Sequence, residues 1–216
     1  MERMLLNKRE KVLVEPLIIS SMPNWCFASY VIEGEKKEID GIERMMRKLD
    51  RMEKPAVENG FGTNWLGCIV NELGCDWNEV RCRGTWSELE RVDDSTIKFN
   101  TKTAWAPCNE TLDLICKHFP TLRYFYSSKE PNMCEYWTND KEGKYFPERF
   151  FIDLCTPKEE YDCEYFRTLD DALKWLREKY SKDIGSLEDV EKLCEKWEEE
   201  FPDAFCYLYE YRIDMD

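Results

Sequence analysis

Aromatic and amide side chains in three short clusters are the residues of this chain best suited by type to bind a ligand. The clusters are Met22-Pro23-Asn24-Trp25-Cys26, Gly62-Thr63-Asn64-Trp65 and Thr103-Ala104-Trp105-Ala106-Pro107. An indole offers a flat face to a base or a peptide and an N–H group for a hydrogen bond. The alternative is that the tryptophans pack in the core and that asparagines beside them fix turns. The predicted binding residues are Asn24, Trp25, Asn64, Trp65 and Trp105.

Acid–base or nucleophilic catalysis would have to involve His118, because it is the only histidine of the chain. A general base needs an orienting partner, and no neighbouring residue suggests one. Cys108 and Cys116 would act as nucleophiles only beside such a base. The chain also lacks the G-x-x-x-x-G-K-[ST] and G-x-G-x-x-G patterns that bind phosphates. We therefore predict no catalytic residue, with an enzyme as the alternative.

The eleven cysteines are scattered and include no C-x-x-C pair. Cys68, Cys75 and Cys82 lie seven residues apart, a spacing that matches no common zinc site. We interpret the cysteines as buried reduced thiols and predict no metal and no cofactor. Glu130 and Glu135 flank Pro131-Asn132 and are the carboxylates best placed for a metal or substrate site. Glu135 is therefore included among the predicted binding residues.

The net charge of −14 is concentrated at the C-terminal end. Residues 153–216 carry 20 acidic and 9 basic side chains, whereas the preceding part carries 25 acidic and 22 basic ones. Duplex binding through phosphates needs the opposite sign, so nucleic acid is disfavoured as a partner. Single-stranded binding on an open sheet face stays an alternative. So does mimicry of DNA by the acidic segment, although charge also serves solubility.

The pattern of residues 26–126 predicts the order β-α-β-β-α-β. The predicted strands are 26–33, 80–89, 96–103 and 122–126. The predicted helices are 35–53, 65–73 and a third one capped by Asn109. The first strand carries apolar residues on both faces, which is typical of a central strand. This order indicates an α+β, ferredoxin-like fold, an antiparallel sheet with helices packed on one face.

The spacing of apolar residues predicts which helix faces are buried. In the first helix Ile39, Ile42, Leu49 and Met52 recur at helical spacing and are expected to face the core. Further strands are predicted at 133–137, 145–154 and 163–166. Beyond them the chain is predicted to form an acidic helical extension that ends in a strand over 205–213. Its second helix follows a cap at Ser186, with Leu187, Val190, Cys194, Trp197 and Phe201 inward.

Four motifs in order resemble those of the YubB-type ferredoxin-like family of plasmid, phage and mobile-element proteins. They are Met22–Cys26, Gly62–Trp65, Thr103–Cys108 and Phe119–Leu122, where the family has M-P-N-W-C, G-T-K-W, T-A-W-x-P-P and F-P-x-L. The similarity covers residues 22–150. Asn64 stands where the family has lysine and Cys108 where it has a second proline, so a ligand site that used that lysine would be altered here. The resemblance implies the fold and a mobile-element setting, and no settled activity.

These observations predict three parts: an N-terminal arm at 1–21, a core domain at 22–152 and an acidic α/β extension at 153–216 packed on the core. No stretch is long and apolar enough to span a membrane, and charges interrupt the N-terminus too often for a signal peptide. A cytoplasmic location is therefore predicted. The favoured function is a non-enzymatic accessory protein that contacts a protein partner.

Overall fold

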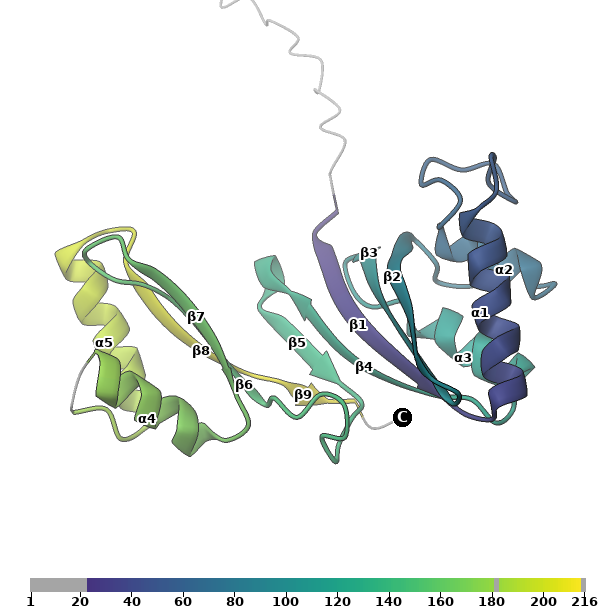
Figure 1. Ribbon diagram of the computed structural model, residues 1–216. Helices are drawn as coiled ribbons and strands as arrows, with labels where there is room; N and C mark the ends of the chain where they lie inside the picture. The colour runs from purple at the N-terminus through teal and green to yellow at the C-terminus, as the bar shows by residue number, and fades with distance from the viewer. Residues whose placement is uncertain (1–22, 181–182, 215–216) are drawn as a thin grey trace, which may run out of the picture.

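The computed structural model describes residues 23–180 and 183–214, which form two β-sheets with helices on their outer sides. In Figure 1 the helices lie at the two outer sides of the molecule and the sheets lie between them. The α+β class is confirmed. The predicted arm at 1–21 lies outside the described residues.

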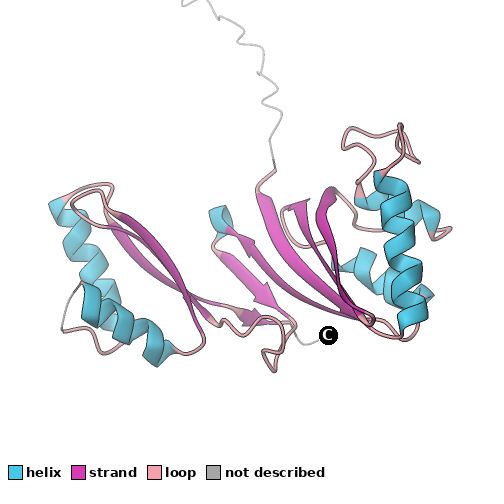
Figure 2. Ribbon diagram, in the orientation of Figure 1, coloured by secondary structure: helices cyan, strands magenta, loops and turns pink. Residues whose placement is uncertain are grey.

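The larger sheet begins with the predicted strand and helix order. Its first four strands are β1 (Trp25–Glu33), β2 (Gly84–Asp93), β3 (Thr96–Ala104) and β4 (Arg123–Glu130). They lie in the order β2-β3-β1-β4, each antiparallel to its neighbour, so β1 is central as predicted. The helices of this part are α1 (Lys36–Asp50), α2 (Leu66–Glu72) and α3 (Asn109–His118). All three cover the same face of the sheet (Figure 2).

The main core lies between that face and the three helices. Ala28, Tyr30 and Ile32 alternate along β1 and are buried there with the apolar face of α1. Met52 was predicted to join this core, but it is 37% exposed because α1 ends at Asp50. The predicted cap of α3 is also wrong. The Asn109 side chain accepts a hydrogen bond from the Tyr30 hydroxyl (2.9 Å) and caps no backbone amide.

Two short strands extend the larger sheet beyond β4. They are β5 (Glu135–Thr138) and β9 (Arg212–Ile213). β5 follows β4 through the one-turn 3-10 helix η1 (Pro131–Met133), whose amides at Asn132 and Met133 donate to the Glu130 carboxylate. β9 pairs parallel to β5, so the prediction of a wholly antiparallel sheet is wrong. A parallel neighbour needs a long connection, and the C-terminal part of the chain supplies it.

The smaller sheet has the order β7-β6-β8 and is antiparallel. Its strands are β6 (Phe150–Cys155), β7 (Tyr161–Phe166) and β8 (Phe205–Glu210), and its helices are α4 (Leu169–Lys179) and α5 (Leu187–Glu200). Both helices begin at side-chain caps, and the one at Ser186 was predicted. Thr168 accepts from the Asp171 amide (3.1 Å) and Ser186 from the Asp189 amide (3.3 Å). The apolar sides of both helices pack on one face of this sheet.

Three predictions for the C-terminal part need correction. The single strand predicted at 205–213 is divided at Tyr211, so that β8 lies in the smaller sheet and β9 in the larger one. The boundary predicted after residue 152 falls inside β6, a strand of the smaller sheet. Leu187 is 48% exposed, since it is the first residue of α5 and precedes the turns that pack on the sheet.

An aromatic cluster, here called the aromatic joint, connects the two sheets. It consists of buried Tyr136, Phe151 and Tyr211, with Tyr165 and Tyr209 packed against them. The rings of Tyr136 and Tyr209 stack at 4.8 Å and those of Phe151 and Tyr165 at 4.6 Å. Within the described residues, no helix has both the length and the apolar content needed to cross a membrane.

Candidate ligand-binding groove

One face of the larger sheet is covered by no helix of the described residues, and it forms the floor of a groove. Phe27 of β1 lies between Lys102 of β3 and Lys129 of β4, directly opposite each. Residues opposite one another on adjacent strands point to the same face, so the two lysines flank the phenyl ring. The Phe27 side chain is 43% exposed, whereas its neighbour Ala28, on the helix face, is 3% exposed. An apolar ring is therefore displayed in the middle of the sheet.

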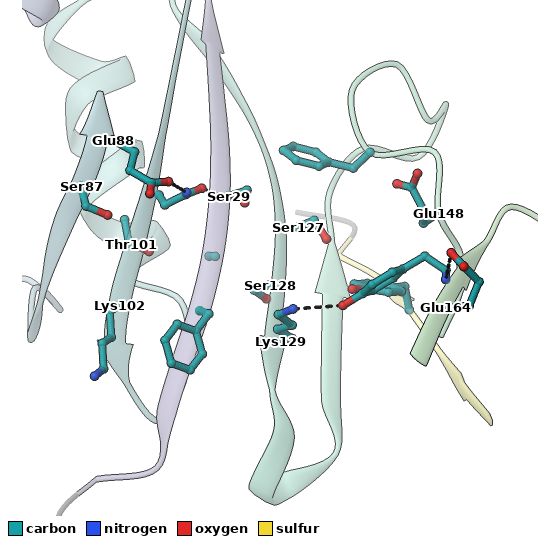
Figure 3. A pocket seen from close by; sticks show the side chains of 16 residues that line it. Ser29, Ser87, Glu88, Thr101, Lys102, Ser127, Ser128, Lys129, Glu148 and Glu164 are labelled. Carbon is teal, nitrogen blue, oxygen red and sulfur yellow. Dashed lines mark hydrogen bonds between the residues drawn. The ribbon is translucent and has the colours of Figure 1, made fainter. Parts of the chain in front are cut away.

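The groove has a volume of about 810 Å³ and a second wall from the other half of the molecule. Figure 3 shows Lys102 and Lys129 on the strands of the larger sheet, with Glu148 and Glu164 on the opposite wall. Phe146 and Tyr165 also line that wall. Two lysines thus lie on the floor and two glutamates on the opposite wall, and the Glu88 carboxylate of β2 also lines the floor side.

The two lysines on the floor carry charges that no carboxylate of the described residues neutralises. The Lys102 ammonium lies 4.7 Å from the centre of the Trp25 ring and 5.7 Å from that of Phe27. The Lys129 ammonium donates to the Tyr165 hydroxyl (3.0 Å). In the described part of the chain neither lysine forms an ion pair, whereas Lys98 on the same face is paired with Glu90 (3.0 Å). Lys102 and Lys129 are therefore able to meet an anion.

Polar side chains next to Phe27 add hydrogen-bonding groups to the floor. The Ser29 hydroxyl donates to Asn100 Oδ1 (2.8 Å), and the Asn100 amide donates to the Glu88 carboxylate. Glu88 adopts a positive φ of 55° where the pairing of β2 with β3 shifts register. Such an irregularity re-aims a side chain, here toward the groove. The floor thus combines an aromatic ring, two cations and a chain of donors and acceptors.

Trp105 lies just beyond the end of β3 in a strained backbone conformation. Its φ is +74°, which a bulky residue rarely adopts, and its side chain is 46% exposed. The Trp105 amide donates to the Asn24 carbonyl (2.8 Å), and Thr103 Oγ1 donates to the Ala106 carbonyl (2.8 Å). Strain held by surrounding bonds is a known feature of binding sites. The fold therefore holds a large indole at the surface.

The structure separates the predicted binding residues into two groups. Asn24, Trp25 and Trp105 lie together at one end of the open face, where Trp25 opposes Ala104 in the strand pairing. Asn64 and Trp65 lie on the helix side. Trp65 is 5% exposed and stacks on Phe61 at 6.3 Å.

Asn64 and Glu135 have structural neighbours away from the groove. Asn64 Nδ2 donates to the Trp86 carbonyl (2.6 Å), and the Trp86 amide donates to the Asn64 carbonyl (3.0 Å). This reciprocal pair attaches the 62–65 turn to β2. Glu135 opposes Glu130 across β4 and β5, on the face opposite to that of Lys129. None of the six predicted residues lines the groove itself; Trp25 contacts one residue that does, because the Lys102 ammonium lies 4.7 Å from its ring.

The residues considered for catalysis, Cys108, Cys116 and His118, do not line the groove. Burial raises the pKa of the Cys108 thiol to about 12 and that of the Cys116 thiol to about 11. His118 is exposed at the end of α3, with its ring 4.8 Å from that of Phe119. Among the described residues, no three His, Cys, Asp or Glu side chains are grouped so that they could hold a metal ion.

Phe27, Lys102 and Lys129 were not among the binding residues predicted from the sequence. The strand at 26–33 was interpreted as a central strand with apolar residues on both faces, and every second residue from Trp25 to Ser29 lies on the open face. A signal was present in residues 98–102, where Lys98, Asn100 and Lys102 alternate with buried Phe99 and Thr101. Such alternation is typical of a strand with one solvated face.

Comparison with protein-family models, curated proteins and solved structures found no match to this chain.

Proposed function

We propose that this protein is a non-catalytic binding protein that holds a single-stranded nucleic acid on the open face of its larger sheet. The observation that carries this proposal is the position of Phe27, an exposed ring flanked on both sides by lysines that form no ion pair within the described chain. A base would stack on Phe27 while the lysines contact the phosphates on either side. Ser29 and Asn100 offer hydrogen bonds to the edge of that base.

The acidic wall of the groove limits which nucleic acids would bind. Glu148 and Glu164 face the lysines across the groove and would repel a second phosphate backbone. A single strand can instead turn its phosphates to Lys102 and Lys129 and its base amino groups to the carboxylates. The proposal is therefore restricted to single strands, in keeping with the net charge of −14.

We further propose that the larger sheet is ferredoxin-like and that the chain is an accessory protein of the YubB type, from a mobile element and located in the cytoplasm. The order β2-β3-β1-β4, with helices on one face, supports the fold. The eleven cysteines are all free thiols, which supports a reducing compartment. The four motifs of residues 22–122 support the family.

A protein partner is the second candidate, favoured by the exposed aromatic side chains of the acidic half. Tyr161 is 65% and Tyr207 42% exposed on the smaller sheet. DNA mimicry has less support. Lysines on α4 and α5 pair with carboxylates at Asp162, Glu178 and Glu188, which breaks up any continuous row of negative charge.

The test is a fluorescence anisotropy titration of the full chain with labelled single strands of about 12 nucleotides and mixed sequence, as RNA and as DNA, at low salt. Phe27→Ala should weaken binding by roughly 5- to 150-fold, since one base–aromatic stack contributes about 1–3 kcal/mol. Lys102→Gln and Lys129→Gln should each reduce the slope of log K against log salt concentration by about 0.7, because each variant neutralises one phosphate fewer.

Lys117→Gln is the matched control, because it removes the same charge from an exposed position on α3, on the other side of the sheet. It should leave the affinity within about twofold of wild type. If neither RNA nor DNA binds, or if Lys117→Gln weakens binding as much as Lys102→Gln, the groove is not a nucleic-acid site.

A further inference from the structure

The smaller sheet also has a face that no helix within residues 23–180 and 183–214 covers, and an aspartate lies at its middle. In the strand pairing Asp153 of β6 lies opposite Cys163 of β7 and Tyr207 of β8. Tyr161, two residues before Cys163, shares this face. We call Asp153, Tyr161, Cys163 and Tyr207 the tyrosine face. It adjoins the aromatic joint, because the paired residues Phe151 and Tyr209 lie two positions along β6 and β8 from the pair Asp153 and Tyr207.

Asp153 has an acceptor atom that the protein leaves unused. Its Oδ1 atom is buried and has no hydrogen-bond partner among the described residues. The neighbouring Tyr161 hydroxyl has a raised pKa, chiefly through a hydrogen bond to the Asp153 carboxylate, so Oδ1 is the oxygen that is left without a donor. A buried carboxylate oxygen without a partner is costly, which is why such atoms are rare in native proteins. An acceptor without a donor beneath an exposed tyrosine is expected at a site where a ligand supplies the missing hydrogen bond.

The rings around Asp153 are accessible. Tyr161 is 65% exposed and Tyr207 is 42% exposed. The Tyr207 ring stacks on Phe205 at 5.1 Å and lies 6.1 Å from that of Tyr209, so a row of aromatic faces runs along β8. Because Tyr161 is mostly outside the core, its ring is available to stack on a ligand bound beside the carboxylate.

We propose that Asp153, Tyr161 and Tyr207 form a site for an arginine side chain presented by a basic segment of a partner protein. A guanidinium is planar, stacks on aromatic faces and donates two parallel hydrogen bonds to one carboxylate. A lysine ammonium lacks the planar fork and is more strongly hydrated, so it fits this arrangement less well.

The negative charge of the surrounding residues also favours a basic partner. Residues 153–216 carry 20 acidic and 9 basic side chains, so the half that holds the tyrosine face attracts cations. A basic segment would be drawn to this half by its overall charge and oriented by Asp153. The site is separate from the groove at Phe27, and it does not depend on nucleic-acid binding.

The test is isothermal titration calorimetry of the full chain with a blocked peptide in which arginine alternates with glycine, and with its lysine counterpart. The arginine peptide should bind about tenfold tighter than the lysine peptide. Asp153→Asn should weaken arginine binding at least about tenfold, since it removes the charge that pairs with the guanidinium. Tyr161→Ala and Tyr207→Ala, at exposed positions, should each weaken it by about two- to fivefold.

Two control variants distinguish a specific arginine site from general electrostatic attraction to the acidic half. Glu199→Gln removes one exposed charge from α5 in the same half and should change the affinity by less than about twofold. Phe27→Ala should leave peptide binding unchanged, so loss of the groove and loss of this site can be told apart. Asp153→Asn should also be at least as stable as wild type in urea, because it removes the charge from a carboxylate with an unsatisfied buried oxygen.

Three results would overturn the proposal: equal affinity for the arginine and lysine peptides, wild-type affinity in Asp153→Asn, or equal weakening by Asp153→Asn and Glu199→Gln. If Asp153→Asn does not fold, the two tyrosine variants decide, because unchanged affinity in both would exclude the site.

Discussion

Glu33, at the end of β1, forms hydrogen bonds with the loop at 139–149, which supplies one wall of the groove. Its carboxylate accepts hydrogen bonds from Arg123 (2.8 Å), Lys144 and Tyr145. Burial by itself would raise the pKa of Glu33, but the hydrogen bonds from Lys144 and Tyr145 outweigh it and lower the pKa. The ionised carboxylate therefore stabilises the folded state.

Replacement of Glu33 by glutamine should destabilise the protein in a pH-dependent way. We expect Glu33→Gln to lower the free energy of unfolding by about 1–2 kcal/mol at pH 7, because an amide oxygen accepts less strongly from charged donors. The pKa of Glu33 is lower in the folded than in the unfolded chain, so this stabilisation is present above the unfolded pKa and is lost as the pH falls through the folded pKa. Urea unfolding at pH 7 and at pH about 3 measures both. An equal difference at the two pH values would contradict the assignment.

Among the elements, the loop at 139–149 owes its shape to one buried carboxylate. Asp140 is 1% exposed and accepts from the backbone amides of Lys144 (3.0 Å), Tyr145 (2.6 Å) and Phe146 (2.8 Å). Burial would raise the pKa of Asp140, but these three amides outweigh it and lower the pKa. The Arg149 guanidinium closes the loop through the carbonyls of residues 140, 141, 146 and 148. The wall residues Phe146 and Glu148 are thereby held in place.

Asp140→Asn should loosen this loop. In this variant an NH2 group, which is a donor, replaces one of the two carboxylate oxygens, so at least one backbone amide of the loop loses its acceptor. We expect a loss of about 1–3 kcal/mol in the free energy of unfolding. Hydrogen exchange at residues 144–146 should accelerate more than exchange in β1. Glu142→Gln, at an exposed position of the same loop, is the control and should change neither quantity. Unchanged exchange at 144–146 in Asp140→Asn would refute this account.

In the whole molecule, the two sheets are connected by aromatic packing together with the short pairing of β9 and β5. Tyr136 is 4% exposed at the centre of the aromatic joint, with the rings of Tyr209, Tyr211 and Phe151 at 4.8, 5.5 and 5.6 Å. The pairing of β9 with β5 spans only two residue pairs. The joint is therefore expected to couple the unfolding of the two halves.

Tyr136→Ala should uncouple them. Removal of a buried aromatic ring lowers the free energy of unfolding by about 3–5 kcal/mol. In this variant the lost packing is that of the aromatic joint. We expect urea unfolding to change from one transition to two, or to show a reduced m-value. Tyr161→Ala removes the same kind of ring from an exposed position and should leave the transition unchanged. A single transition with an unchanged m-value in Tyr136→Ala would show that the joint does not carry the coupling.

The local elements of this fold could be predicted because each is determined by neighbouring residues. The start of α5 follows from its predicted side-chain cap at Ser186. Some predictions were wrong because a distant residue had intervened. Asn109 does not cap α3 because the Tyr30 hydroxyl, from β1, engages its side chain.

By itself, the amino-acid sequence determined the order of strands and helices, the acidic C-terminal half and the positions of most core residues, since periodicity and charge are local properties. Only the tertiary structure decided which strand faces remain open, because that depends on where helices far along the chain pack. It placed Lys102 and Lys129, 27 residues apart, on either side of Phe27. It also divided the last strand between two sheets, because β9 pairs with β5, and sequence periodicity does not encode a pairing between segments so far apart.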